Sequence, residues 1–378
     1  MVETTLQQFQ EAFKNRYALG RELKAAGQRV IGWVCAWIPE EVFHAGGVFP
    51  MRVLGGGTGE TPQADAHLYS NNCTFVRSCL EEAFRGNWDF LDGLVACNSC
   101  DHVRRLYDSW HQYIKTDYKT ALGIPCKVTP TTINFFAKDI VLLQKELEET
   151  FGVSITGEAL RRSIEVYNHG RALLKQLYAL RRSDFPPITG AETMEVVRAS
   201  WALPREEYND LLEKLLRELP GRKVTDEDAF RLMILGSELD DPDYIYAIEE
   251  LGGIVVIDDL CCGSRNFWNQ VELEDDKDPI QALARRYLER PFCPRMHPSS
   301  TRVDHLQQLA RDYRIDGVIF ESIKFCDSHA GTFPVIKMCF DELDLPVLNL
   351  EREYIMTGAG QMKTRVGAFF ESLEGRRV

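Results

Sequence analysis

The chain has 378 residues, which is long enough for two domains with hydrophobic cores of their own. Hydrophobic residues make up 44% and charged residues 27%, as in ordinary globular proteins. The net charge of −13 disfavours nucleic acid or an anionic membrane surface as a partner. The sequence has no apolar run of membrane-spanning length and no secretory signal at its start, so we expect a cytoplasmic protein.

The first part of the chain is expected to contain an N-terminal helix in residues 1–28 and an N-terminal α/β domain in residues 29–137. Two predicted strands flank a short helix that Pro39 opens, and this order favours a parallel sheet. The strands expected in this domain are residues 29–35, 49–54, 90–96 and 126–129.

Residues 138–220 are predicted to be a helical connector, because apolar side chains recur there at three- and four-residue spacing. Residues 221–378 then form a second α/β domain. Its expected strands are residues 230–235, 254–259, 317–320 and 346–350. The predicted fold class is therefore α/β, with two Rossmann- or flavodoxin-like parallel-sheet domains joined by helices.

The chain contains eleven cysteines, which is unexpected in a reducing compartment where disulfides are rare. Cys35, Cys79 and Cys339 lie inside apolar or helical patterns and are interpreted as small buried hydrophobes. Cys73 and Cys100 instead fall at predicted helix starts, where a thiol pKa is lowered and the metal-binding thiolate is favoured. These positions predict a metal site.

The remaining cysteines indicate which kind of metal site this is. Cys100, Cys262 and Cys326 each follow a predicted strand, and ligands of parallel sheets bind at the carboxyl ends of the strands. The only Cys-x-x-Cys pair is Cys97–Cys100, so a zinc ribbon is poorly supported and a ferredoxin-type run is absent. A dispersed set of this kind is typical of an iron–sulfur cluster in an enzyme core.

Nothing in the sequence indicates an ATP site. The glycine-rich stretch at residues 55–59 lacks the lysine of a phosphate-binding loop and is interpreted as a flexible loop.

Six short segments, taken in order, resemble the benzoyl-CoA reductase and 2-hydroxyacyl-CoA dehydratase family. They are residues 38–41 with 44–47, 73–78, 100–101, 258–261 with 263–265, 325–327, and 360–361 with 364–369. The resemblance implies two α/β domains with an iron–sulfur cluster between them. Its three common cluster cysteines correspond to Cys73, Cys100 and Cys326.

The stretch 326–329 and the N-terminal segment most resemble the smaller C-type subunit of ATP-dependent benzoyl-CoA reductase. That resemblance implies a subunit that passes very low-potential electrons to benzoyl-CoA or a related acyl-CoA thioester, with ring dearomatisation as the outcome. The implied partners are a homologous second reductase subunit, two ATP-binding subunits with a bridging [4Fe-4S] cluster, and ferredoxin as upstream donor. The alternatives are a subunit of a radical 2-hydroxyacyl-CoA dehydratase, a double-cubane reductase component and a non-catalytic assembly subunit.

A related branch of the family holds a double-cubane [8Fe-9S] cluster on six cysteines. A similar order and spacing is present here in Cys73, Cys100, Cys126, Cys262, Cys293 and Cys326. Cys261 is the alternative to Cys262, and a single [4Fe-4S] cluster is the alternative to the double cluster.

The sequence offers few candidates for proton donation to the substrate and for binding CoA. Glu41 and His44, with His329, are candidate proton donors to a substrate. Arg265 and Arg365 are candidates for binding the phosphates or carbonyl groups of CoA.

Overall fold

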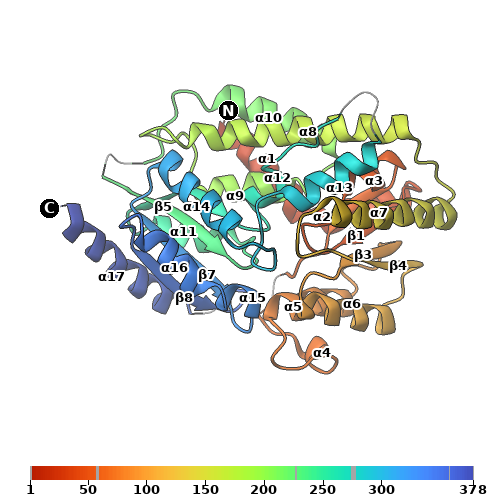
Figure 1. Ribbon diagram of the computed structural model, residues 1–378, viewed down its shortest axis with the longest axis horizontal. Coiled ribbons are helices and arrows are strands. Elements are labelled where there is room, and N and C mark those ends of the chain that lie inside the picture. The colour runs from red at the N-terminus through yellow and green to blue at the C-terminus, as the bar shows by residue number, and fades with distance from the viewer. Residues whose placement is uncertain (1, 57–58, 226–227, 274–277, 357, 378) are drawn as a thin grey trace.

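The computed structural model consists of two α/β halves that lie side by side, with long helices across one face of both (Figure 1). It describes residues 2–56, 59–225, 228–273, 278–356 and 358–377. Each half contains a four-stranded parallel sheet. The predicted α/β architecture is therefore confirmed.

The N-terminal sheet has the strand order β2-β1-β3-β4. Its strands are β1 (Val30–Trp33), β2 (Phe49–Arg52), β3 (Gly93–Cys97) and β4 (Tyr118–Leu122). Its helices are α3 (Glu40–Ala45), α4 (Pro62–Asp65), α5 (Thr74–Phe84) and α6 (Asp101–Tyr113). Strands β1 to β3 are buried along their whole length, which explains the apolar runs that predict them.

The fourth strand differs from the prediction. Residues 126–129 form only a single bridge, between Lys127 and His297, and β4 lies earlier in the chain. Strand β4 is at the edge of the sheet, so its middle residues are partly exposed and the sequence lacks a continuous apolar run. A prediction based on apolar runs misses such an edge strand.

Six further helices come from the N-terminus and from the segment between the two sheets. They are α1 (Val2–Lys14), α2 (Arg16–Ala25), α7 (Pro130–Phe151), α8 (Gly157–Leu180), α9 (Gly190–Ala199) and α10 (Arg205–Glu218). Two N-terminal helices thus replace the single one predicted. The connector begins at Pro130, because Thr129 and Thr132 form a capping box there and proline occupies the first helical turn.

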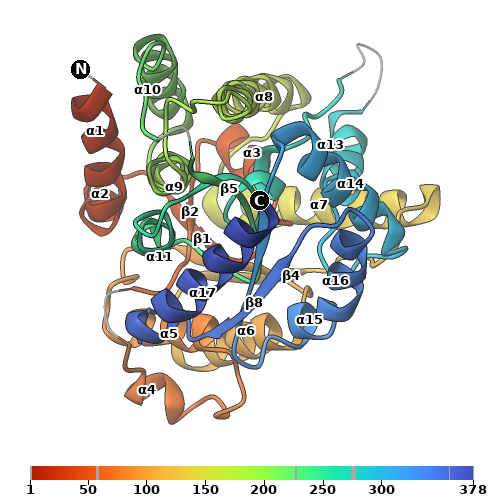
Figure 2. The same cartoon turned by 90° about the vertical axis from the view of Figure 1, so that its left-hand side faces the viewer.

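The C-terminal sheet has the order β6-β5-β7-β8, which is the same connectivity as in the first sheet. Its strands are β5 (Phe230–Gly236), β6 (Gly253–Asp259), β7 (Gly317–Ile323) and β8 (Val347–Arg352). Its helices are α11 (Pro242–Glu249), α12 (Ser264–Phe267), α13 (Pro279–Glu289), α14 (Ser300–Tyr313), α15 (Asp327–Ala330), α16 (Phe333–Asp341) and α17 (Ala359–Arg377). Figure 2 shows α17 on the outer side of this half.

The repeated strand order decides where a ligand can bind. In each sheet the first connection leads to a neighbouring strand on one side and the next connection leads to the other side, so the strand order reverses between the first and third strands. Ligands of open α/β sheets bind at such a point, beyond the carboxyl ends of these strands. These positions are the ends of β1 and β3 in one half and of β5 and β7 in the other. Among the described helices, none combines the length and apolarity needed to cross a membrane.

Candidate metal centre

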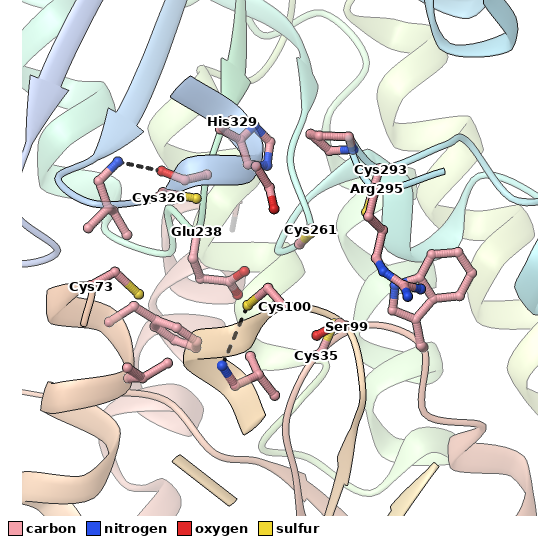
Figure 3. Close-up of a pocket in the computed structure, with 18 residues that line it drawn as sticks. Cys35, Cys73, Ser99, Cys100, Glu238, Cys261, Cys293, Arg295, Cys326 and His329 are labelled. Atoms are coloured by element: carbon pink, nitrogen blue, oxygen red, sulfur yellow. Dashed lines mark hydrogen bonds between the residues drawn. The ribbon is translucent and has the colours of Figure 1, made fainter. Parts of the chain in front are cut away.

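A cavity of about 110 Å³ lies where the carboxyl ends of the two sheets meet. It has room for several water molecules. Its lining includes the six cysteines Cys35, Cys73, Cys100, Cys261, Cys293 and Cys326. Three of them, Cys73, Cys100 and Cys326, are here called the first trio, and Cys35, Cys261 and Cys293 are called the second trio. Figure 3 shows Cys73 and Cys326 on one side of the cavity, Cys293 on the other, and Cys100 between them.

The strand ends bring these cysteines together. Cys35 and Cys100 follow β1 and β3, and Cys326 follows β7. Glu238 follows β5 and lines the same cavity. The reversal points of both sheets therefore face one space, which explains how cysteines far apart in the sequence become neighbours.

Each cysteine of the first trio precedes a helix. Cys73, Cys100 and Cys326 are the N-cap residues of α5, α6 and α15. The Cys100 Sγ accepts a hydrogen bond from the Val103 N–H at 3.5 Å. The Cys73 N–H donates to the Nδ1 of His102 at 2.8 Å, and this bond ties the two cysteine segments together.

The second trio comes from loops. Cys35 has a φ of +76°, which is rare for a residue other than glycine, and Phe325 beside Cys326 has a φ of +68°. Both backbone strains occur at cavity residues or next to them. Cys261 follows β6, and Cys293 follows α13. Such strain is typical of functional sites, where the surrounding fold holds a residue in a required position.

The thiols differ in their protonation. Burial raises the pKa of Cys100 and Cys261 to about 12 and that of Cys326 to about 11. These groups are neutral thiols near pH 7 and would release protons on binding a metal as thiolates. At Cys35, a hydrogen bond with the Cys97 thiol lowers the pKa to about 5 despite burial, with help from Ser99, Arg290 and Arg52.

Glu238 and His329 are titratable non-cysteine side chains in the lining of the cavity. Glu238 forms an ion pair with the buried Arg52, and burial nevertheless raises the pKa of Glu238 to about 7. His329 is buried, and burial with the nearby charges of Arg265 and Arg302 holds its pKa well below the ordinary value. Within the described residues, its Nδ1 has no hydrogen-bond partner. The cavity thus holds one carboxyl that titrates near neutrality and one neutral imidazole.

Two cysteines of the predicted set lie outside this lining. The Cys262 Sγ donates to the Leu239 carbonyl oxygen and accepts from the Leu239 N–H, at 3.2 Å for the second bond, so it faces away from the cavity. Cys126 is exposed, and its carbonyl oxygen accepts from the His297 N–H at 2.8 Å. The structure places Cys35 and Cys261 where the sequence interpretation has Cys126 and Cys262.

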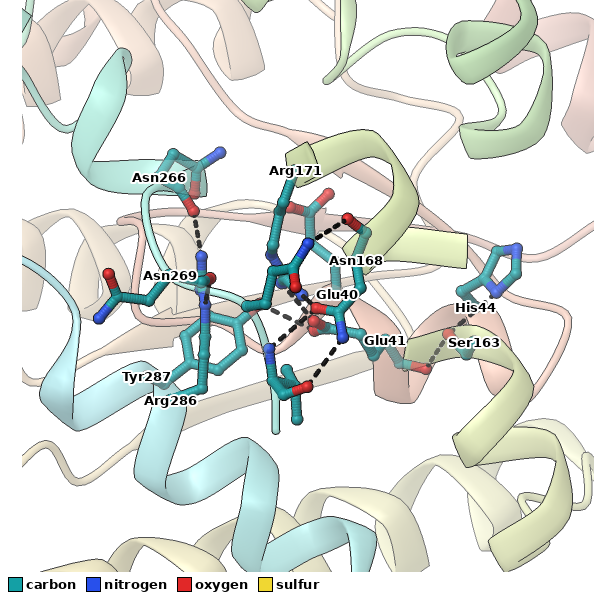
Figure 4. Close-up of polar contacts among 12 residues, drawn as sticks. Glu40, Glu41, His44, Ser163, Asn168, Arg171, Asn266, Asn269, Arg286 and Tyr287 are labelled. Carbon is teal, nitrogen blue, oxygen red and sulfur yellow. Dashed lines mark hydrogen bonds and ion pairs between the residues drawn. The ribbon is translucent and has the colours of Figure 1, made fainter. Parts of the chain in front are cut away.

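The predicted proton donors Glu41 and His44 are not among the lining residues of the cavity. Figure 4 shows the polar contacts around them. Glu41 is fully buried, forms an ion pair with Arg171 of α8 and accepts from the Tyr287 hydroxyl at 2.8 Å. The His44 ring bonds to the Ser163 hydroxyl at 3.0 Å and to Glu206 at 3.1 Å. This network joins α3 to α8 and α13.

The two arginines predicted to bind CoA lie in different parts of the structure. Arg365 of α17 donates to the Asn349 carbonyl oxygen at 2.6 Å on the exposed side of β8. Arg265 is fully buried and lies 3.3 Å from the Asp259 carboxylate. Its charge acts on Cys261 and Cys293. Only Arg265 is therefore close enough to influence the cavity.

Sequence reasoning overlooks Cys35 and Glu238 as cavity residues and names Cys261 only as the alternative to Cys262. Cys35 ends an apolar run and looks like a core residue, although it follows β1 closely, as Cys100 follows β3. The same strand-end argument that selects Cys100 also selects Cys35. Glu238 carries no motif, but it follows the predicted strand 230–235 closely.

The donor set fits an anionic, thiolate-rich group larger than one ion. Within the described residues, no three His, Cys, Asp or Glu side chains come together as they would around a single metal ion. An iron–sulfur cluster separates its thiolates more widely, because they bind different irons. Arg265 and Arg290 are fully buried, and each has guanidinium nitrogens without a hydrogen-bond partner in the described part of the chain. Such donors require a negative charge nearby.

Comparisons with known proteins identify the family of this chain. A family model described as 2-hydroxyglutaryl-CoA dehydratase, D-component, matches residues 35–373. The chain belongs to this family. It is 28% identical over 370 residues to the C-type subunit of benzoyl-CoA reductase from Thauera aromatica, covering 95% of each chain. It is 26% identical over 359 residues to the (R)-phenyllactyl-CoA dehydratase beta subunit of Clostridium sporogenes, covering 93% of this chain and 94% of that one.

A third relative, the beta subunit of (R)-2-hydroxyglutaryl-CoA dehydratase from Acidaminococcus fermentans, is 26% identical over 379 residues, with 98% of this chain and 100% of that one covered. These homologues are dehydratase or reductase subunits that act on CoA thioesters. Their similar identities leave the two activities unseparated for this chain. The predicted family is confirmed.

Proposed function

We propose that this protein is the iron–sulfur subunit of an ATP-dependent reductase that passes very low-potential electrons to an aromatic acyl-CoA thioester such as benzoyl-CoA. The observation that carries the proposal is the convergence of six cysteines on one cavity between the sheets. The likeness to a benzoyl-CoA reductase subunit supports the reaction class. The proposed partners are a homologous second reductase subunit, two ATP-binding subunits that share a [4Fe-4S] cluster, and ferredoxin.

The proposed ligands are the first and second trios together, which suit a double-cubane [8Fe-9S] cluster. When bound, such a cluster supplies one-electron transfer at the negative end of the biological range. Helix starts at Cys73, Cys100 and Cys326 hold the first three thiolates in place, and the strained Cys35 backbone presents a fourth. A single [4Fe-4S] cluster would need only the first trio and would leave the second without a purpose.

The size of the cavity supports a division of labour between subunits. Its volume of about 110 Å³ is far below the ~300–1,000 Å³ of typical ligand pockets. A cluster would fill it and leave no room for an acyl thioester. We therefore propose that this subunit stores or relays electrons and that the sister subunit binds the substrate. Glu238 would hold a proton near neutral pH inside the cavity, with Arg52 fixing its position.

The second candidate function is a beta subunit of a 2-hydroxyacyl-CoA dehydratase, which the two dehydratase relatives favour. The assembled complex, purified without oxygen, separates the two by its substrate. Net reduction of benzoyl-CoA, coupled to ATP hydrolysis, supports the reductase. Dehydration of a 2-hydroxyacyl-CoA without net reduction overturns it in favour of the dehydratase.

The ligand set has its own test. Cys35→Ser and Cys261→Ser should each lower the iron and sulfide bound per chain, whereas Cys126→Ser should not, because Cys126 lies outside the cavity. The three variants make the same chemical change, so Cys126→Ser is a matched control. Iron loss in Cys126→Ser alone would return the assignment to the sequence-based set.

A further inference from the structure

The two trios of the cavity lie in different electrostatic surroundings. Arg290 shows this most clearly, because it is fully buried next to the second trio. Its Nη1 donates to the carbonyl oxygen of Ala36, the residue after Cys35, at 2.7 Å. Its guanidinium lies 4.3 Å from the ring of Trp37, which lines the cavity. Among the described residues it forms no ion pair, and its Nε and Nη2 have no hydrogen-bond partner.

Arg265 adds a second positive charge on this side. It lies 3.3 Å from the Asp259 carboxylate, but Arg302 shares that carboxylate at 2.9 Å. Asp259 is therefore in ion-pair contact with two buried arginines. The Nη2 of Arg265 donates to the Gly236 carbonyl oxygen at 3.2 Å, and its Nη1 has no partner within the described chain.

Arg52 is a third buried arginine beside the second trio. Its Nη1 donates to the Cys261 carbonyl oxygen at 3.3 Å, and its guanidinium forms an ion pair with Glu238. The second trio thus lies beside Arg290, which has no acid partner in the described part of the chain, and beside Arg265, which shares Asp259 with Arg302.

Acidic side chains act on the first trio. The largest charges that act on Cys326 are those of Glu321, which pairs with Arg352 at 2.7 Å, of Asp327 and of another cysteine. The Cys100 Sγ accepts a backbone hydrogen bond from the Val103 N–H at 3.5 Å. Peptide N–H groups supply only partial positive charges, which offset less negative charge than a buried guanidinium does.

We propose that Arg265 and Arg290 make the second trio the half of the site that takes up the first electron. This inference rests on the proposed function, because it requires a cluster on both trios. A cluster held by both trios would supply one-electron transfer: a donor such as a reduced ferredoxin would be oxidised, the part of the cluster held by the second trio would gain that electron, and no bond would form or break. The buried positive charges stabilise that added negative charge, while the acids near Cys326 disfavour it on the first trio.

The test compares charge-removing and charge-keeping changes at Arg290 with a matched control. The variants are Arg290→Met, Arg290→Lys and Arg181→Met. Arg181 is equally buried but bonds to the Val255 carbonyl oxygen within β6 and packs on Tyr178. Iron and acid-labile sulfide are measured first on each anoxic protein. Each is then titrated with titanium(III) citrate and mediators, and the reduction steps are followed by electron paramagnetic resonance.

Arg290→Met should disfavour the first reduction step at least about tenfold, which is 59 mV for a one-electron couple, and should move the second step less. Arg290→Lys and Arg181→Met should keep the wild-type potentials. Iron loss in Arg290→Met, with full iron in Arg290→Lys, also supports the proposal, because the charge is then needed to hold an anionic group.

An unchanged first step in a fully loaded Arg290→Met protein overturns the inference. So does an Arg290→Lys protein that behaves like Arg290→Met, since shape rather than charge would then matter. Wild-type protein that binds no iron is a different result, because it removes the proposed function itself.

Discussion

Glu41 offers a direct test of whether the polar network of Figure 4 is structural or catalytic. Its carboxylate is fully buried between Arg171 of α8 and Tyr287 of α13. Glu41→Gln keeps the size of the side chain but leaves the buried Arg171 charge without its counter-ion. Loss of one partner from a buried ion pair costs about 3–5 kcal/mol of unfolding free energy.

That loss is a large part of the ~5–15 kcal/mol that stabilises a typical domain. The assay is urea unfolding of the metal-free protein under reducing conditions, followed by circular dichroism. The double variant Glu41→Gln/Arg171→Met removes both charges, so it should regain part of the stability lost in Glu41→Gln. Any Glu41→Gln protein that folds should bind as much iron as the wild type, because Glu41 does not line the cavity.

Two results would refute this reasoning. Wild-type stability of Glu41→Gln would mean that the buried pair contributes nothing. Full stability with loss of electron transfer in the assembled complex would instead make Glu41 catalytic, as the sequence interpretation proposes.

Two further predictions concern the sheets. Burial favours the neutral form of Asp92, but Lys24, the Val30 N–H and Arg29 together hold its pKa below the ordinary value. Asp92→Asn should therefore cost about 1.5–3 kcal/mol at pH 7. The difference in urea unfolding should begin to shrink below about pH 4, where the carboxyl of the unfolded chain becomes protonated, and should be lost as the pH falls through the lower pKa of the folded protein. A difference that grows on acidification would contradict the prediction. Gly236 has a φ of +151°, and an added Cβ would lie 1.8 Å from the Glu321 carbonyl oxygen. Gly236→Ala should therefore lower the melting temperature of the protein. Gly367→Ala is the control and should leave the melting temperature unchanged, because a Cβ at this position of α17 meets no neighbouring atom.

The fold could be predicted largely because buried parallel strands produce apolar runs. Strand β6 is buried along its whole length, and the sequence shows it as an uninterrupted run ending in two acids. Strand β4 is the counter-example, since an edge strand has exposed residues that break the run. Helix α7 begins earlier than predicted because a proline there opens the helix instead of ending it.

The site was predictable only in part, for a related reason. Cys73, Cys100 and Cys326 precede helices, and this leaves a local signal in the sequence. Cys261 faces the cavity and its neighbour Cys262 does not. The path of the loop after β6 decides this, because adjacent residues in the loop point in different directions. No local pattern records that path.

The buried charges were also invisible in the sequence. Arg290 matters because its neighbours Ala36 and Trp37 lie far away along the chain, and only the tertiary structure brings them beside it. Spacing along the chain carries no information about such pairs.

The most direct test of the account is the iron and acid-labile sulfide content per chain, measured on protein purified without oxygen and separated from its partners. A cluster on both trios predicts about eight irons per chain, falling clearly in Cys100→Ala. About four irons, retained in Cys35→Ser, would restrict the cluster to the first trio and remove the electron-storage role. Protein without iron after anoxic purification and reconstitution would contradict the central claim and leave the six cysteines of the cavity as buried thiols.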